Sequence, residues 1–543
     1  MNQQRLFLGC FLSLIATAFG FMVRSTILNE WQLQFDLSNE QKGYLNGVGL
    51  YPFAISIILF SLVVDRIGYG TAMAIAFVGH FTSALLTIFA TSFNMLYFAT
   101  FVFALSNGIV EAVINPVVAT IYEKNKTHWL NILHAGWPGG LVFGGLLTIA
   151  VSYVPADVLP GRIWQWQMAL VLIPTVIYGV LLFGQKFPVQ ERVAAGVSYM
   201  DMLREFGTAS CWIVCFLLVA GIDQIMVVRE TTLHEVLGLK GIIDSAAQSM
   251  PEAVAKVILY AVLALVPTVA FGLVVRTFGR PMFVFLLLVM FLLATTELGT
   301  DSWIPDIMGT VLESPRMGTL FLVYTSAIMF VLRFFAGPIV HRTSPLGLLA
   351  LSAAIACAGL LWLSNAGTAV FALFLAATLY GFGKTFFWPT TLGVVSEQYP
   401  KGGALMMNAI AGVGMLAVGT LGGPAIGILQ DRAFDGIMTT QNSELHSQVM
   451  VDRVGLLGAY KALDQAKVEK LPEAEKKVIH KTVAAAQQGT LGKIAVLPLI
   501  MFGCYIGLIV YFQSRGGYKA QVLTGHAAED ERFTGGLNAP MEG

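Results

Sequence analysis

Long apolar segments alternate with short polar connections along most of the chain. About 20 predominantly apolar residues cross a membrane as an α-helix, because the hydrocarbon core is roughly 30 Å thick and a helix rises 1.5 Å per residue. Fourteen segments meet this requirement, approximately at residues 6–28, 44–64, 71–91, 94–120, 130–153, 166–184, 208–228, 253–275, 281–303, 318–340, 347–364, 368–396, 403–429 and 491–513. The pattern predicts an all-α integral membrane protein with about 14 transmembrane helices.

Residues 431–490 do not fit the membrane pattern. They are polar and rich in Lys, Glu, Ala and Gln, above all from Lys461 to Gln488. We expect one or two solvated helices here, outside the membrane and between the last two spans. Two interpretations remain open: an external cap that takes part in function, or an insertion without a function of its own.

Basic residues in the short connections predict the orientation, because Lys and Arg accumulate on the cytoplasmic side. A cytoplasmic N-terminus places most of them on that side: Arg66, Lys124, Lys126, Lys186, Arg192, Arg204, Arg276, Arg280, Arg342 and Lys401. We therefore expect both termini in the cytoplasm of a multi-pass protein of the cell membrane, specifically a bacterial inner membrane.

Composition narrows the range of functions. Apolar residues make up 56% of the chain and charged residues 12%, against about 25% charged residues in soluble domains. The net charge of zero provides no electrostatic footprint for nucleic acid. The sequence has neither H-E-x-x-H nor G-x-S-x-G, and its five cysteines lack metal-type spacing. We expect no enzyme activity, metal or cofactor.

A charged turn follows the second predicted span. Its sequence is Ser61-Leu-Val-Val-Asp65-Arg66-Ile-Gly68-Tyr-Gly70, and it resembles the G-x-x-x-D-R-x-G loop of the major facilitator superfamily, with Ser61 where that family prefers Gly. A second turn, from Arg333 to Arg342, resembles the echo of this loop in the other half of such proteins. The resemblance implies a conformational latch made of Asp65, Arg66, Arg333 and Arg342.

The spacing of the two turns agrees with the architecture of that family. Each turn follows the second helix of a six-helix set, as expected for two parallel repeats. The predicted domains are residues 1–190, a first six-helix bundle; 191–280, a linker with two extra spans; and 281–543, a second six-helix bundle that contains the polar insertion.

A narrower resemblance lies in the fourth predicted span and the segment after it. The residues are Gly108-Ile-Val-Glu111-Ala-Val-Ile-Asn115-Pro116, then Leu130-Asn131 and the glycines at 136, 139 and 140. They resemble the fucose/glucose proton-symporter branch, in which the glutamate of helix 4 is linked to the proton or the sugar. The first span departs from that branch, because Arg24 stands in the neighbourhood where the branch carries an acidic residue.

Four charged residues fall inside predicted spans, where each costs at least about 2.5–3.5 kcal/mol. Arg24, Glu111, Glu297 and Lys384 occupy the first and fourth helices of the two halves. They either line a central cavity or hold each half together as ion pairs, Arg24 with Glu111 and Glu297 with Lys384. Further candidates for binding solute or protons are Asn115, Asn131, His134 and Trp388, whereas we expect Asp301 and Asp306 to be external loop residues.

These features predict a secondary active transporter. The leading hypothesis is proton-coupled uptake of a sugar or sugar-like solute by alternating access, in a monomer whose partners are the solute, protons and the bilayer. Arg24 and Lys384 favour an organic anion such as a sugar acid as the alternative cargo. The number of spans suggests a drug exporter, and a transport-dead membrane sensor or scaffold is the alternative of another class.

Overall fold

The computed structural model describes residues 2–35, 37, 45, 47–155, 158–227, 231–247, 249–455, 458–521 and 523. In this part of the chain, 13 helical segments are long and apolar enough to cross a membrane. The second predicted span corresponds to α3 (Tyr51–Ile67), a helix of 17 residues that packs between α5 and α21. The predicted all-α membrane fold is confirmed.

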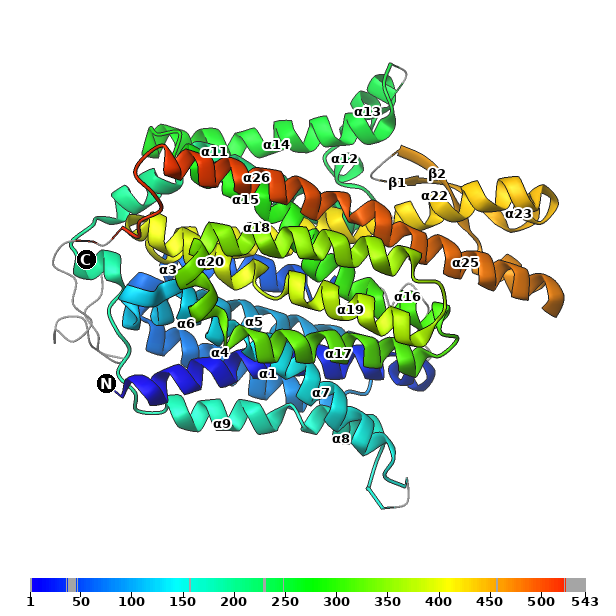
Figure 1. Ribbon diagram of the computed structural model, residues 1–543, viewed down its shortest axis with the longest axis horizontal. Coiled ribbons are helices and arrows are strands. Elements are labelled where there is room, and N and C mark those ends of the chain that lie inside the picture. The colour runs from blue at the N-terminus through cyan, green and yellow to red at the C-terminus, as the bar shows by residue number, and fades with distance from the viewer. Residues whose placement is uncertain are drawn as a thin grey trace.

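The first bundle contains the helices up to residue 182. They are α1 (Gln3–Gln34), α3, α4 (Tyr69–Ile88), α5 (Phe93–Ile121), α6 (Lys126–His134), α7 (Gly136–Ser152), α8 (Ile163–Ala169) and α9 (Leu172–Leu182). Figure 1 shows them as the blue and cyan layer. The pair α6–α7 corresponds to the predicted span 130–153 and the pair α8–α9 to the predicted span 166–184, each interrupted near its start.

The second bundle contains the helices from residue 281 onward. They are α15 (Pro281–Ala294), the π-helix η2 (Thr295–Gly299), α16 (Thr300–Val311), α17 (Pro315–Arg333), α18 (Ala336–Asn365), α19 (Val370–Lys384), α20 (Phe387–Gln398), α21 (Gly403–Ala417), the π-helix η4 (Val418–Gly422), α22 (Gly423–Gln441), α25 (Glu473–Ile494) and α26 (Val496–Gln513). α1 begins and α26 ends at the same end of the molecule (Figure 1), which we call the terminal end.

Two further long helices lie between the bundles in sequence. α11 (Tyr199–Val227) and α14 (Glu252–Val275) pack against each other, and α11 also contacts α21. α12 (Leu233–Val236) and α13 (Lys240–Ala247) connect them at the end opposite the terminal end (Figure 1). The Asp223 carboxylate accepts hydrogen bonds from the Tyr260 hydroxyl (2.5 Å) and the Leu233 amide (2.6 Å), which ties this connection to the helix pair.

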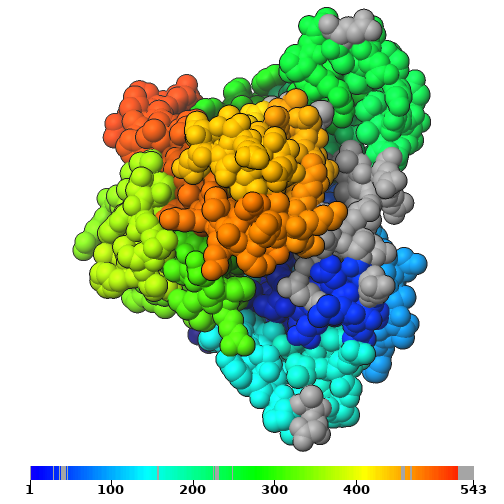
Figure 2. Space-filling view, turned by 90° about the vertical axis from the view of Figure 1, so that its right-hand side faces the viewer, coloured from blue at the N-terminus to red at the C-terminus, as the bar shows by residue number. Residues whose placement is uncertain are grey.

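The polar insertion forms a cap at that opposite end, which we call the cap end. α22 and α25 extend into it and enclose α23 (Ser443–Val449), the hairpin β1 (Met450–Gly455) and β2 (Gly458–Leu463), and α24 (Gln465–Val468). The sequence pattern predicts only helices in this insertion and does not predict the hairpin. Lys461, at the start of the expected helical stretch, lies in β2. Figure 2, which looks onto the cap end, shows the cap over the second bundle and beside the blue and cyan first bundle.

Polar side chains fasten the cap to the second bundle. Gln488 Nε2 donates to the carbonyls of Leu363 (3.0 Å) and Gly367 (2.9 Å), and Gln487 Nε2 donates to Asp306 Oδ2 (2.9 Å). The expectation that Asp306 is an external loop residue is wrong, because it lies on α16 and binds the cap.

Candidate solute-binding site

A cavity lies between the two bundles at the centre of the molecule. Its lining combines two tryptophans, two glutamates, an arginine and a histidine with apolar side chains: Phe53, Ile57, Glu111, His134, Trp137, Glu297, Leu298, Arg333, Trp388 and Met415. Four of the predicted candidates, Glu111, His134, Glu297 and Trp388, therefore line one cavity. Such a lining, mostly apolar with a few convergent polar groups, is typical of sites for small molecules.

Prolines leave two backbone carbonyls near this cavity without their helical hydrogen-bond donors. A proline inside a helix has no N–H for the carbonyl four residues before it, and its ring displaces that carbonyl. Pro138 in α7 thereby leaves the His134 carbonyl without its helical donor, and Pro389 in α20 does the same for Thr385. Both prolines follow a tryptophan that lines the cavity.

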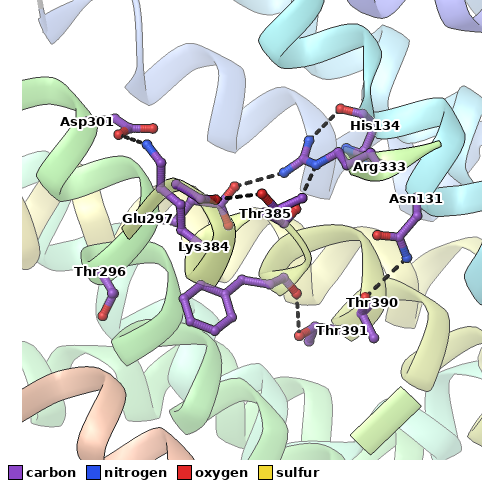
Figure 3. A network of polar contacts seen from close by, with 12 residues as sticks. Asn131, His134, Thr296, Glu297, Asp301, Arg333, Lys384, Thr385, Thr390 and Thr391 are labelled. Carbon is purple, nitrogen blue, oxygen red and sulfur yellow. Dashed lines mark hydrogen bonds and ion pairs between the residues drawn. The ribbon is translucent and has the colours of Figure 1, made fainter. Parts of the chain in front are cut away.

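Arg333 binds both of these carbonyls. Its Nη1 donates to His134 O (2.5 Å) and its Nε to Thr385 O (2.8 Å), while Nη2 forms an ion pair with Glu297 Oε1 (3.0 Å). Figure 3 shows the guanidinium group lying between Glu297 and His134. Arg333 is buried at the end of α17. The sequence pattern placed it in a latch at the membrane edge, and the structure places it at the central cavity instead.

Pro116 has the same effect in α5. It frees the Ala112 carbonyl, which accepts a hydrogen bond of 2.9 Å from Asn408 Nδ2 of α21. Neighbouring helices commonly satisfy backbone groups that prolines release inside membranes. Here the donors at Ala112 and His134 come from the second bundle, so two of the freed carbonyls join the bundles.

Glu111 begins a chain of hydrogen bonds that crosses the cavity. Asn115 Nδ2 donates to Glu111 Oε2 (2.8 Å), and Asn115 Oδ1 lies 2.9 Å from His134 Nε2. Because the Asn115 amide donates to Glu111 through its nitrogen, its oxygen accepts from His134, whose Nε2 then carries the proton. The His134 carbonyl accepts from Arg333, which pairs with Glu297. The acidic residues of the two bundles are thus connected.

The other predicted charges find different partners from those expected. Lys384, fully buried, pairs with Asp301 on α16 and lies 5.2 Å from the centre of the Tyr380 ring. The assignment of Asp301 to an external loop is therefore wrong. Glu297 lies in η2, a π-helical turn of a kind that is frequent at functional sites, and its ion-pair partner is Arg333 rather than Lys384.

Asn131 lies on the terminal side of the cavity and contacts the other bundle. Its Nδ2 donates to Thr390 Oγ1 (3.1 Å) and to Thr127 O (2.9 Å). Nearby, Glu397 Oε1 of α20 accepts from Thr127 Oγ1 (2.5 Å) and from the Thr127 amide (3.2 Å), and Glu397 Oε2 accepts from Tyr518 (2.8 Å). These contacts close the space between the bundles at the terminal end.

The predicted latch has a different composition. Asp65 Oδ2 forms an ion pair of 2.7 Å with Arg192, and both side chains are buried. Arg66 instead stacks over the Tyr199 ring, 4.3 Å from its centre, and Arg342 is exposed. Arg192, which follows the first bundle, is the partner of Asp65. In the sequence it served only as one of the basic residues that predict the orientation.

The neighbouring residue of the linker is bound in the same way. Glu191 Oε2 pairs with Lys126 at 2.6 Å, again between buried side chains. Sequence reasoning missed Glu191, Thr127 and Glu397 as site residues. The sequence does contain a signal for such contacts: acidic residues near buried prolines, and basic residues at the ends of predicted spans. This signal does not identify the contacts, because the residues that meet are distant in sequence.

Thr127→Val tests the closure at the terminal end. Removing the hydroxyl that donates to the buried Glu397 carboxylate costs about 1.5–3 kcal/mol in the closed arrangement, so we expect the bundles to separate there. Double electron–electron resonance between spin labels at the exposed residues Lys124 and Lys401 should show a larger population of long distances. Thr120→Val is the matched control, because Thr120 Oγ1 binds Pro116 O within its own helix. An unchanged distance distribution in Thr127→Val would contradict this assignment.

Comparisons with known proteins agree with this architecture. The family model of the Major Facilitator Superfamily matches residues 9–424. No curated protein matches the sequence significantly. Among solved structures, the proton:xylose symporter XylE of E. coli is similar with a TM-score of 0.59 and 12% identity, over 93% of this chain and 97% of that chain.

Other transporters share the fold. The fucose:proton symporter FucP of E. coli is similar with a TM-score of 0.52 and 13% identity, over 92% of this chain and 98% of that chain. The human organic anion transporter MFSD10 has a TM-score of 0.54 and 13% identity, over 93% and 100%. At these identities the likeness concerns the fold. The predicted family is confirmed: the chain belongs to the Major Facilitator Superfamily and is a multi-pass membrane transporter.

Proposed function

We propose that this chain is a proton-coupled transporter that takes up a small polar, sugar-like solute by alternating access. The observation that carries the proposal is the chain of hydrogen bonds from Glu111 through Asn115 and His134 to Arg333 and Glu297. It links the acidic groups of both bundles across the cavity, so a change at one of them alters contacts that join the bundles.

Glu111 is the proposed proton carrier. It is buried, and no ion pair joins it to another residue in the part of the chain that the structure describes. Burying an isolated carboxylate is costly, and taking up a proton removes the charge. Glu297 differs because the Arg333 guanidinium compensates its charge. We assign Glu297 to the contact between the bundles.

The positions of the contacts support entry from the cap end. The hydrogen bonds of Thr127 and Asn131 with the second bundle lie between the cavity and the terminal end, and that of His134 lies at the cavity itself. Alternating access then requires these contacts to break while the bundles close at the cap end. With the basic connections at the terminal end in the cytoplasm, this direction is uptake by a monomer in a bacterial inner membrane.

The cavity suits a ring with hydroxyl groups. Trp137 and Trp388 contribute flat apolar surfaces, and Glu111, His134 and Arg333 contribute groups that form hydrogen bonds. Two structural relatives, XylE and FucP, are symporters of the sugars xylose and fucose. We also propose the domain boundaries 1–190, 191–280 and 281–543. In this division the linker contributes Glu191 and Arg192 to the ion pairs at the terminal end.

Glu111→Gln tests the coupling. In proteoliposomes with a proton gradient, we expect accumulation of solute to fall at least 100-fold, whereas exchange of labelled for unlabelled solute without a gradient persists. The amide keeps the hydrogen bonds of the site but cannot exchange a proton near neutral pH. Glu473→Gln in the exposed part of α25 is the matched control. Gradient-driven accumulation that survives in Glu111→Gln would show that Glu111 does not carry the proton.

Organic-anion transport is the second candidate function, and one specific observation favours it. Arg24 is a buried cation for which the described part of the chain supplies no ion-pair partner. One structural relative, MFSD10, is an organic anion transporter.

A further inference from the structure

Arg24 differs from the other buried cations of the protein. Lys126, Arg192, Arg333 and Lys384 each form an ion pair with a carboxylate. Arg24 is 5% exposed, its Nε has no hydrogen-bond partner, and no ion pair joins its guanidinium group to another residue that the structure describes. Its contact with an aromatic ring, Phe21 at 5.6 Å, does not neutralise the charge.

An unpaired guanidinium at this depth is unfavourable. Arginine stays protonated in proteins, and burying an uncompensated charge costs several kcal/mol. Soluble and membrane proteins therefore pair buried charges or use them to bind ligands. A bound anion would supply the negative charge that the described residues do not provide for Arg24.

The surroundings of Arg24 connect it with the cavity. α1 packs against α5 and α7, and α3 packs against α5. The Arg24 side chain nevertheless reaches the segment before α3, where any side chain at Gly49 would collide with the guanidinium group. It thus joins α1 to the segment that leads into α3. Phe21 contacts both Arg24 and Trp137 (6.1 Å between ring centres), and Trp137 lines the cavity.

The remaining charges limit the ligand to one negative charge. Glu297 with Arg333 and Asp301 with Lys384 are neutral as pairs, and Glu111, the proposed proton carrier, is neutral when it holds its proton. In that state Arg24 is the uncompensated positive charge near the cavity among the described residues. A phosphate monoester carries about −1.5 to −2 charges at pH 7, more than one guanidinium balances. A carboxylate carries one charge and fits the planar fork of an arginine through two hydrogen bonds.

We propose that Arg24 binds the carboxylate of the transported solute, which makes this solute a small polar monocarboxylate of the sugar-acid class. The inference rests on the proposed function, because it names the solute of the same transport cavity. The carboxylate binds Arg24 on α1, while the hydroxyl-bearing part of the solute faces Trp137 and the polar groups of the cavity.

Binding to the full-length protein in detergent tests the proposal without requiring transport. The probes are D-gluconate, D-glucuronate, D-glucose and glucose 6-phosphate, and the readout is the Tm followed by tryptophan fluorescence. A ligand of the folded state raises the Tm with its concentration. We expect a rise with the two sugar acids and at least a tenfold weaker response to glucose and to glucose 6-phosphate.

Variants of Arg24 separate binding from folding. Arg24→Met removes an uncompensated buried charge but retains an apolar side chain, so we expect an unchanged or higher Tm without ligand and no response to the sugar acids. Arg24→Lys keeps the charge without the planar fork, and we expect its affinity for the acids to fall about tenfold. It also serves as the readout if Arg24→Met fails to fold.

Three results would overturn the proposal: neither acid raises the Tm of the wild type, glucose raises it as much as the acids do, or the Arg24 variants respond to the acids like the wild type. A different set of results would contradict the proposed function. If Glu111→Gln leaves gradient-driven accumulation intact, the proton assignment fails while binding through Arg24 stands. If a neutral sugar accumulates through Glu111 and the acids do not bind, only the role of Arg24 fails.

Discussion

Replacing Arg333 by methionine is expected to lower the free energy of unfolding by about 3–5 kcal/mol and to abolish transport. Removing one partner of a buried ion pair leaves the other charge uncompensated, and here Glu297 is that charge. The variant also leaves the carbonyls of His134 and Thr385 without the donors that their prolines made necessary. Unfolding in mixed detergent micelles and uptake in proteoliposomes measure the two effects.

Two controls make the Arg333 result specific. Arg342→Met alters an exposed arginine, for which we expect a change within about 0.5 kcal/mol. Combining Arg333→Met with Glu297→Gln removes both charges, so the double variant should recover a large part of the stability lost in the single one. If Arg333→Met costs no more than Arg342→Met, Arg333 does not hold the centre of the protein together.

Replacing Arg192 by methionine is expected to cost about 3–5 kcal/mol as well, for the same physical reason. Its partner Asp65 is buried, and the ion pair joins α3 to the linker that follows the first bundle. Arg66→Met removes a cation that stacks on the Tyr199 ring, an interaction worth about 0.5–1 kcal/mol at an exposed site. The same unfolding measurement compares the two variants.

Comparing Arg192→Met with Arg66→Met tests which arginine pairs with Asp65. The pattern groups Asp65 with its neighbour Arg66, and on that basis Arg66→Met would be the more damaging change. The structure assigns the larger effect to Arg192, a residue 127 positions from Asp65. A loss of stability in Arg66→Met that equals or exceeds the loss in Arg192→Met would contradict the ion pair described here.

Prolines explain why Arg333 and Asn408 bind backbone carbonyls. Pro116, Pro138 and Pro389 each deprive one carbonyl of its helical donor, and each of those carbonyls binds a side chain from another helix. Such contacts satisfy the backbone only in one relative position of the helices. Moving the bundles during transport therefore requires Arg333 and Asn408 to leave these carbonyls or to carry the helix segments with them.

The sequence by itself determined the elements that local composition controls. Apolar runs long enough to cross a bilayer predicted the helices, including the extra pair α11 and α14, and the charged turn at Asp65 indicated the family. The four-residue separation of Glu111 and Asn115 places both side chains on one helix face, and a hydrogen bond joins them in the structure. These features depend on residues within a few turns of one another.

Only the tertiary structure decided which charged and polar side chains meet. Glu297 and Arg333 are 36 residues apart, Asp301 and Lys384 are 83 apart, and Thr127 and Glu397 are 270 apart. Hydrophobic periodicity specifies which face of a helix is buried, but the partner across that face depends on how the helices cross and on where prolines and π-helical turns shift the register. For that reason Arg333 was assigned to the membrane edge by its sequence motif and lies at the cavity in the folded protein.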